Sequence, residues 1–379
     1  MLGGVGLLLV ALLPIFLLRA PSSAPNLLFV TIDTLRADHV GAWGYAGAAT
    51  PALDGLAARG VRFAHAETAV PLTGPSHSTI FTGLYPPLHG VRDNVIFTLD
   101  ERHPTLAVLL KRRGYRTAAF VAAYPVAKAF GFGQGFDEYH ENFHEIPIPG
   151  QGAERPGNEV ADQAIGWLQR EAPGPFFAWV HFYDPHAPYT PPSPYRERFA
   201  GRLYDGEIAF ADAQLGRVLD TLKATGQEKN TAVVVMADHG ESLGDHDEQT
   251  HAILIYESTL HIPLIFAGRG VPRGRVVSDR VGTVDVLPTV LGLLGVPAPD
   301  GLSGRDLRPA LEGHSLRPQP LYAESLFGRL NCRWSSLRAL TLEDWKLIQG
   351  GGTEVFDLAH DPQETRDLSA AEPERAQRL

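Results

Sequence analysis

The sequence predicts an α/β protein whose mostly parallel central sheet is covered by helices on both faces. From Asn26 onward, short β-rich apolar runs alternate with stretches of helical spacing, as in layered α/β folds. The apolar runs are continuous rather than alternating with polar residues, as expected of strands buried on both sides. After about Pro297 the pattern changes to short strand-like pieces, which predict a small C-terminal subdomain with an antiparallel sheet.

The predicted strands and helices are spread along the whole chain after residue 25. The predicted strands of the central sheet are residues 26–32, 115–121, 176–182, 231–236 and 262–267. Helical spacing covers residues 104–113, 158–171 and 205–225. Pro104 and Gly114 are suitable start and stop signals for the first of these helices. In the C-terminal subdomain, short strands are predicted around residues 321–323, 337–340, 346–349 and 354–357.

The N-terminal segment differs from the rest of the chain. Residues 1–18 carry no charged side chain and no polar face, and a Pro/Ser linker follows Arg19. This pattern favours an export signal or membrane anchor over a buried core helix. Prolines crowd the candidate cleavage sites, so we expect an uncleaved anchor that holds the protein on the periplasmic or extracellular side of a membrane. The alternative is that the segment is a signal that is cleaved and that the protein is secreted.

The predicted organisation therefore has three parts. Residues 1–25 form the signal or anchor with its linker, residues 26–297 the main α/β domain, and residues 298–379 the C-terminal subdomain. The formal net charge of −10 provides no basic field for a polyphosphate backbone, which argues against a nucleic-acid partner. Cys332 is the single cysteine, so an intrachain disulfide and a thiolate metal site are both excluded.

Two predicted strands end in side chains that can bind a metal. Asp33 follows the strand at 26–32, and Asp238 with His239 follows the strand at 231–236. Ligands of an α/β sheet gather at such carboxyl ends. Carboxylate and imidazole together suit a divalent cation such as Mn, Zn or Mg better than Ca. Taken singly, each Asp could instead cap a turn.

A third feature is the segment from Val70 to Gly83. Pro75 suits the first turn of a helix that runs towards Gly83, which places Thr73 near the helix N-terminus, where anions are favoured. A metal-bound hydroxyl at this point would be a nucleophile towards a tetrahedral oxyanion ester. The alternative is that Thr73 only caps the helix.

Two other histidine-containing segments have simpler interpretations. The run 245–248 (Asp-His-Asp-Glu) has no framing strand, and we interpret it as a solvated loop beside the site. His181 lies within an aromatic strand, and we interpret it as a core histidine whose hydrogen bonds are satisfied.

The sequence resembles the sulfatase family within the alkaline phosphatase superfamily. The matching motifs occur in family order over nearly the whole chain after residue 25. They are residues 31–39 (TIDTLRADH), 50–54 (TPALD), 73–83, 89–94 (HGVRDN), 184–189 (DPHAPY), 238–244 (DHGESLG), 261–266 (HIPLIF), 285–289 (DVLPT), 356–358 (FDL) and 361–362 (DP).

The resemblance implies an alkaline phosphatase-like fold and a set of site residues. Asp33, Asp238 and His239 would hold one divalent metal together with a nucleophile at Thr73. His186 and His251 match positions that face the transferred group or the leaving group, and each could supply a hydrogen bond or a proton. His77 stands where the family has an arginine, and we expect it to contact the substrate as well.

Three departures from the family pattern bear on the substrate. Thr73 replaces the Cys or Ser that sulfatases oxidise to formylglycine, so formylglycine is not expected. Ala122 and Ala123 stand where the family often has Lys and His, and Thr250 stands where a Lys often precedes His251. A Thr nucleophile resembles the superfamily's membrane-anchored phosphotransferases and phosphodiesterases.

The sequence therefore predicts a hydrolase or transferase that acts on phosphoric esters through Thr73. Hydrolysis of a sulfuric ester is one alternative, and a non-catalytic protein that binds an anion is another. The expected partner is a small anionic ester or a lipid or glycan headgroup.

Overall fold

The computed structural model describes residues 24–144, 153–170 and 172–379. The predicted signal or anchor at 1–18 lies outside these residues and stays a prediction. Among the helices of the described residues, none is both long enough and apolar enough to cross a membrane.

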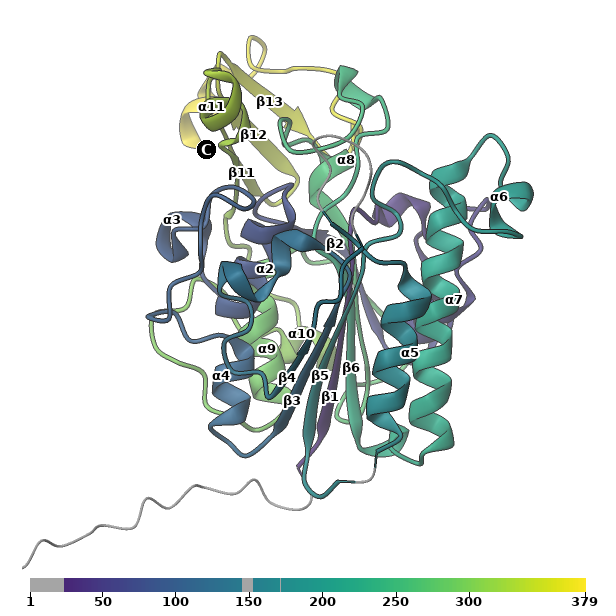
Figure 1. The fold of residues 1–379 in the computed structure, drawn as a ribbon. Helices are drawn as coiled ribbons and strands as arrows, with labels where there is room; N and C mark the ends of the chain where they lie inside the picture. Colours follow the sequence, from purple (N-terminus) through teal and green to yellow (C-terminus); the bar gives the residue numbers. More distant parts are fainter. Residues whose placement is uncertain (1–23, 145–152, 171) are drawn as a thin grey trace, which may run out of the picture.

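The central sheet has nine strands within the described residues, and it runs through the middle of the molecule (Figure 1). Its order is β4 (Glu138–His140), β3 (Arg116–Val121), β5 (Phe176–Phe182), β1 (Asn26–Ile32), β6 (Thr231–Ala237), β7 (His261–Gly268), β2 (Val61–Glu67) and β8 (Arg275–Val277), and β9 (Val281–Gly282) pairs with β2. Among these described strands, β7 alone runs antiparallel to both of its neighbours. The predicted mostly parallel sheet is therefore confirmed.

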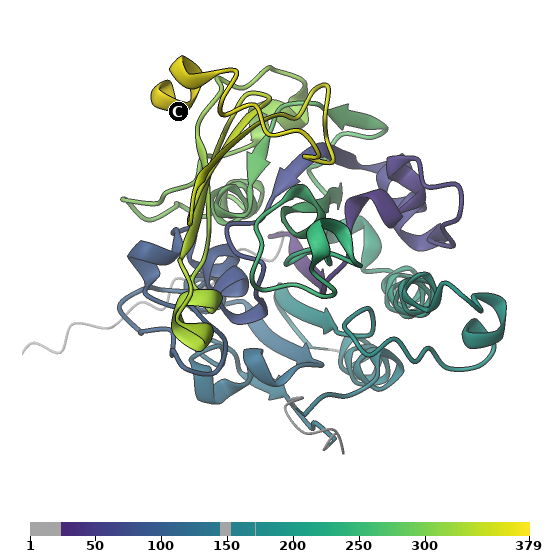
Figure 2. The same ribbon diagram turned by 90° about the horizontal axis from the view of Figure 1, so that it is seen from above.

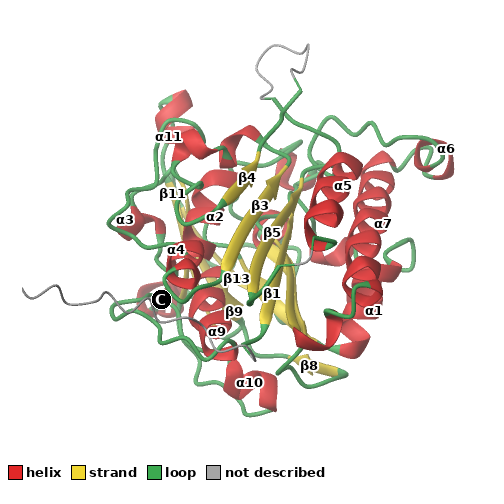
Figure 3. Ribbon diagram, turned by 60° about the horizontal axis from the view of Figure 1, so that its bottom comes forward, coloured by secondary structure: helices red, strands yellow, loops and turns green. Residues whose placement is uncertain are grey.

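Helices cover both faces of this sheet, as the sequence predicts (Figure 3). One face carries α1 (Pro51–Arg59), α5 (Gly157–Leu168) and α7 (Leu203–Ala224). The other carries α2 (Thr73–Thr82), α4 (Leu106–Lys111), α9 (Val286–Leu293) and α10 (Arg308–Glu312). The remaining α-helices are the short α3 (Pro86–His89), α6 (Tyr195–Arg198), α8 (Glu257–Leu260), α11 (Phe327–Cys332) and α12 (Pro373–Arg378).

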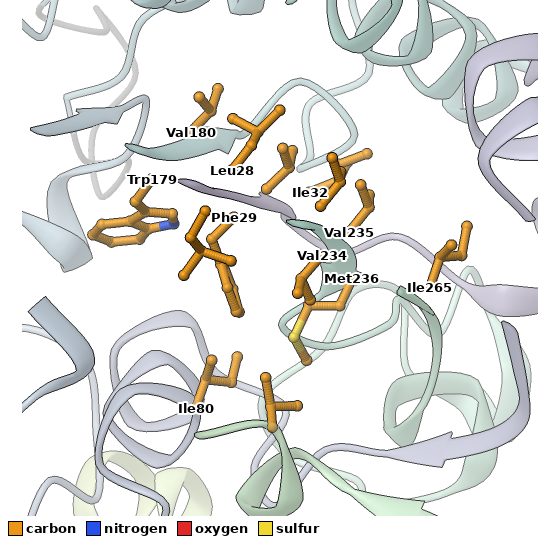
Figure 4. Close-up of a cluster of buried hydrophobic side chains, with 14 of the residues drawn as sticks. Leu28, Phe29, Ile32, Ile80, Trp179, Val180, Val234, Val235, Met236 and Ile265 are labelled. Carbon is orange, nitrogen blue, oxygen red and sulfur yellow. The ribbon is translucent and has the colours of Figure 1, made fainter. Parts of the chain in front are cut away.

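The core is built by alternate residues of the buried strands. Phe29 and Met236 extend towards Ile80 of α2, whereas Leu28 and Val235 extend to the opposite face of the sheet (Figure 4). Successive strand residues point to opposite faces, so a strand covered on both sides is apolar at most positions on both faces. This requirement explains why the continuous apolar runs of the sequence mark β1, β5 and β6.

A second sheet lies near the carboxyl ends of the parallel strands. It is antiparallel and consists of β10 (Leu321–Ser325), β11 (Leu337–Leu342), β12 (Trp345–Gln349) and β13 (Thr353–Asp357). Figure 2, which looks down on the molecule from above, shows it to one side of the central sheet. The predicted small antiparallel sheet is thus confirmed.

A buried ion-pair cluster joins the second sheet to its surroundings. Lys346 of β12 is 0% exposed, and its Nζ lies 2.9 Å from Glu364 Oε1 and 3.2 Å from Glu257 Oε1. Glu257 belongs to α8, which leads into β7 of the central sheet. Breaking such a buried pair leaves an uncompensated charge, which is costly.

Replacing Lys346 by methionine is therefore expected to lower the free energy of unfolding by about 3–5 kcal/mol. Urea denaturation measures this change. The matched control is Lys111→Met, because Lys111 pairs with Asp137 at the surface, where the two side chains are 47% and 45% exposed. The control substitution should lower the free energy of unfolding by about 0–1 kcal/mol. An equal decrease in the free energy of unfolding for the two variants would contradict a stabilising role of the buried cluster.

Candidate active site

Polar side chains gather at the carboxyl edge of the central sheet. β5, β1 and β6 are adjacent and parallel, so the residues that follow them emerge at one edge. Asp33 follows β1, and Asp238 and His239 follow β6. The structure therefore brings Asp33 together with Asp238 and His239, from which about 200 positions separate it in the sequence.

Asp33, Asp238 and His239 form a buried cluster with the composition of a metal site. Each is 0% exposed, and one ligand atom from each lies within 4.8 Å of the other two. His239 Nε2 lies 3.8 Å from Asp33 Oδ1 and 3.6 Å from Asp238 Oδ2. Two ligands that are each about 2.0–2.2 Å from one ion can be at most about 4.4 Å apart, so these distances suit a shared cation.

The hydrogen bonding of the cluster supports the same conclusion. Both Asp33 carboxylate oxygens, Asp238 Oδ2 and His239 Nε2 are buried and have no hydrogen-bond partner among the described residues. Buried polar atoms without a partner are rare, and a divalent cation would satisfy all four. His239 Nδ1 lies 2.9 Å from the carbonyl oxygen of Gly240, to which it must donate, so the Nε2 lone pair faces the carboxylates.

The electrostatics of the two carboxylates also favour a cation. Burial raises the pKa of Asp33 well above its usual value, and the nearby Asp238 carboxylate adds to this shift. The Thr73 hydroxyl acts in the opposite direction and lowers the pKa of Asp33. A divalent cation would offset the repulsion and keep both carboxylates ionised.

Thr73 is the first residue of α2, and the helix N-terminus is fixed to the end of β6. All residues of α2 are buried. The Ser76 hydroxyl donates to the carbonyl of Asp238 at 2.7 Å, and Asn94 Oδ1 accepts from the backbone N–H of Gly74 at 2.7 Å. The predicted helix is therefore present, and its geometry holds Thr73 near the metal cluster.

His77 lies one turn further along α2 and is 0% exposed. Its Nδ1 donates to the carbonyl of Thr73 at 2.8 Å, and its Nε2 lies 3.0 Å from the hydroxyl of Thr31. Burial lowers its pKa, so the ring is neutral at pH 7. Both nitrogens have protein partners, which suits a residue that positions Thr73. Its predicted contact with substrate stays a prediction.

His186 and His251 extend the site away from the metal cluster. The ring of His251 lies 4.6 Å from that of His239 and 5.0 Å from that of His186. Burial lowers the pKa of His186 to about 3 and that of His251 to about 4, so both rings are neutral at pH 7. His186 Nδ1 donates to the carbonyl of Ala187 at 2.7 Å, which leaves its Nε2 as a proton acceptor.

A cavity of about 480 Å³ opens beside His186. Its lining includes Asp184, Glu154 and Glu207. Burial raises the pKa of Glu154 to about 7 and that of Glu207 to about 8, so these carboxyl groups can donate as well as accept hydrogen bonds near neutral pH. The cavity therefore suits a polar, hydroxyl-bearing group.

The raised pKa of Glu207 makes stability depend on pH. Its pKa is about 8 in the folded protein against an ordinary value of 4.5, so the folded state binds the proton more tightly than the unfolded state. The free energy of unfolding should therefore fall as pH rises from about 4.5 to 8. Glu207→Gln removes this contribution, and the variant should gain stability over the unmodified protein between pH 5 and pH 8.

Urea denaturation at the two pH values measures this effect. The amide oxygen of glutamine can still accept the backbone N–H of Thr190, as Glu207 Oε1 does at 2.7 Å. The control is Glu101→Gln, which changes an exposed carboxylate and should leave the pH dependence unaltered. If the free energy of unfolding depended on pH identically in Glu207→Gln and the unmodified protein, Glu207 would not be the group that makes stability depend on pH.

The structure also adds residues that the sequence analysis did not select. Glu241 is 0% exposed, and its Oε1 lies 3.1 Å from His251 Nδ1. Its position two residues after His239 could have identified it from the sequence as a site residue. Glu248, within the run interpreted as a solvated loop, is buried and accepts the backbone N–H groups of Ile253 and Leu254. It therefore shapes the loop that carries His251.

The fold and this site together define a hydrolase of the kind that uses a divalent metal. A sequence model of the Sulfatase family matches residues 25–296, and the chain belongs to that family. The family's divalent metal fits the buried Asp/His cluster.

Individual relatives agree with this assignment. The Δ4,5-hexuronate-2-O-sulfatase of Bacteroides thetaiotaomicron is 26% identical, over 91% of this chain and 84% of the relative. An arylsulfatase of Clostridium perfringens is 25% identical, over 92% of this chain and 91% of the relative. The crystal structure of a phosphonate monoester hydrolase of Agrobacterium radiobacter superposes with a TM-score of 0.79, at 23% identity and 93% coverage of both chains, which shows a shared fold.

Proposed function

We propose that the protein is a metal-dependent hydrolase of a monoanionic ester, with a sulfuric ester of a small sugar as the first candidate. The observation that carries this proposal is the buried Asp33–Asp238–His239 cluster beside Thr73 at the N-terminus of α2. The named relatives are sulfatases, which favours the sulfuric ester over the phosphoric ester that the sequence analysis ranked first.

Each residue has a role that its position supports. Asp33, Asp238, His239 and the Thr73 oxygen would hold the metal, which lowers the pKa of a bound hydroxyl and neutralises charge on the ester. The Thr73 oxygen is the nucleophile, because it lies beside Asp33 at a helix N-terminus that favours an anion. As the Thr73 oxygen attacks, its proton passes to the departing alcohol, and water then hydrolyses the Thr73 ester and restores the hydroxyl. His186 and His251 would carry these protons.

The charge of the site favours a monoanionic ester. Two carboxylates and one divalent cation sum to zero, and the histidines are neutral. Within the described residues, the basic side chains that contact the Asp33 and Asp238 carboxylates are His77, His181 and His239, with no Lys or Arg among them. A doubly charged phosphate monoester would lack a counter-charge, whereas a sulfate monoester or a phosphodiester carries a single charge.

The cavity beside His186 supports a sugar as the alcohol. Its carboxyl groups can donate and accept hydrogen bonds, as a ring of hydroxyls requires, and His186 connects the cavity to the reacting centre. The relative from Bacteroides thetaiotaomicron is named for its action on a hexuronate, which is also a sugar.

The second candidate is a phosphodiester or phosphonate monoester. The nature of Thr73 favours it, because threonine offers a hydroxyl where an aldehyde hydrate would form from Cys or Ser. The fold that the chain shares with the phosphonate monoester hydrolase is compatible with such a substrate.

A panel of chromogenic esters tests the proposal. The metal-loaded protein is assayed with 4-nitrophenyl sulfate, bis(4-nitrophenyl) phosphate, 4-nitrophenyl phenylphosphonate and 4-nitrophenyl phosphate. We expect the highest kcat/KM for the sulfate and the lowest for the doubly charged phosphate monoester. Turnover of the phosphodiester alone would establish the second candidate. Binding of metal without turnover of any ester, sulfated sugars included, would favour a non-catalytic anion-binding protein.

A further inference from the structure

Three carboxyl groups from separate parts of the chain line the cavity beside His186. Glu154 precedes α5, Asp184 follows β5, and Glu207 lies in the first turns of α7. The volume of about 480 Å³ lies within the range of roughly 300–1,000 Å³ that is typical of small-molecule sites. The fold therefore gathers three acidic side chains around a space that is large enough for a ligand.

Two of these carboxyl groups have an oxygen that the protein leaves without a hydrogen bond. Glu207 is 5% exposed, and its Oε1 accepts the backbone N–H of Thr190 at 2.7 Å, whereas no described residue donates to its Oε2. Asp184 Oδ1 accepts the backbone N–H of Gly157 at 2.8 Å, and its buried Oδ2 has no partner among the described residues. Such oxygens are rare in buried positions, and a ligand that donates hydrogen bonds would satisfy them.

The basic side chains around the cavity do not neutralise these carboxyl groups. Arg155 lines the cavity, but its guanidinium donates to two backbone carbonyls and to Gln163 Oε1. His144 pairs with Glu159 at 2.7 Å, and Arg196, whose charge acts on Glu207, is exposed. In the part of the chain that the structure describes, the three carboxyl groups therefore form no ion pair.

The lack of a counter-charge is reflected in the protonation of all three groups. Burial raises the pKa of Glu154 to about 7, that of Asp184 to about 6 and that of Glu207 to about 8. The charge of Asp184 adds to the shifts of the other two. A bound cation would supply the missing charge and keep the carboxyl groups ionised.

The spacing of the carboxyl groups favours an organic cation over a metal ion. Within the described residues, three ligand atoms lie within 4.8 Å of one another only in the cluster of Asp33, Asp238 and His239. The carboxyl groups of the cavity are thus too dispersed to surround one metal ion, whereas an ammonium group can bond to one of them in the field of the other two.

We propose that this cavity binds a protonated amine, so that the sugar whose sulfate ester is hydrolysed is an amino sugar with a free amine. The ammonium donates to Glu207 Oε2, and Asp184 and Glu154 surround it with further negative charge. The inference rests on the proposed hydrolysis of a sugar sulfate and adds the charge of the sugar to it.

Binding of three matched sugars tests this proposal without any variant. The metal-loaded full-length protein is titrated calorimetrically at about pH 7, which keeps the amine protonated, with the methyl glycosides of glucosamine, N-acetylglucosamine and glucose. The N-acetyl sugar keeps the nitrogen but has no charge. We expect glucosamine to bind about 10-fold or more tightly than the other two, as a hydrogen bond to a charged group implies. Equal affinities for the three sugars would overturn the proposal.

Two variants assign the preference to the carboxyl group of Glu207. Glu207→Gln keeps the acceptor for Thr190 but replaces the cavity oxygen by a neutral amide, so its affinity for glucosamine should fall about 10-fold, to that for glucose. The matched control is Glu159→Gln, which removes a nearby charge that is already paired with His144. It should keep the preference for glucosamine. An unchanged preference in Glu207→Gln would overturn the proposal.

The same protein assayed with the chromogenic esters separates this inference from the proposed function. Turnover of 4-nitrophenyl sulfate without any preference for glucosamine would overturn the amine site and leave the sulfatase activity in place. A preference for glucosamine that Glu207→Gln abolishes, in a protein that hydrolyses no ester, would support the amine site and overturn the proposed function.

Discussion

Replacing Thr73 by alanine is expected to lower kcat/KM for the preferred ester by about 10³-fold or more, because removal of a nucleophile leaves only binding and electrostatic stabilisation. The variant should fold normally, since in the part of the chain that the structure describes the Thr73 side chain makes no hydrogen bond that holds α2 in place. That helix is fixed instead by Ser76 and Asn94. Steady-state kinetics on the ester panel measures the loss.

Two further variants separate the chemistry of Thr73 from its packing. Thr73→Ser keeps the hydroxyl and should retain most of the activity. Thr82→Ala is the matched control, because Thr82 is a buried threonine of the same helix whose hydroxyl donates only to the carbonyl of Ser78. It should leave kcat/KM unchanged. Full activity in Thr73→Ala would show that Thr73 is not the nucleophile and that a water molecule attacks directly.

The fold was predictable where burial imposes a pattern on the sequence. β1, β5 and β6 are covered on both faces, so nearly every position is apolar, and their predicted bounds agree with the structure to within a residue. β2 was not predicted, because its half-exposed Arg62 and His65 interrupt the apolar run. The reversed direction of β7 could not be predicted either, since it depends on pairing with strands distant in the sequence.

The candidate site was predictable where chemistry follows directly on a strand. Asp33, Asp238 and His239 were found because they come immediately after apolar runs. His181 was misjudged at one of its two nitrogens: Nδ1 lies 3.0 Å from the Thr31 hydroxyl, whereas the buried Nε2 has no hydrogen-bond partner within the described residues. That information exists only after β1, β5 and α2 have packed together.

Loss of the metal is expected to abolish turnover and to lower thermal stability. A ligand that binds only the folded state stabilises it by about 2.7 kcal/mol at 100 times its Kd. The melting temperature of chelator-treated protein should therefore rise on addition of Mn²⁺ or Zn²⁺. Asp238→Asn should show no such rise. Its metal-free form should nevertheless be at least as stable as metal-free unmodified protein, because one of two adjacent buried carboxylates is gone.

A buried carboxylate that has hydrogen-bond partners in the protein should respond to substitution in the opposite way to Asp238. Asp212 accepts the backbone N–H groups of Ala52 and Leu53 at the start of α1, at 3.0 Å and 2.9 Å. Asp212→Asn should lose stability with and without metal and keep the full metal-dependent rise. The two variants therefore separate an aspartate that binds metal from one that caps a helix. Differential scanning calorimetry with and without metal measures both effects, and a metal-dependent rise in Asp238→Asn equal to that of the unmodified protein would exclude Asp238 as a ligand.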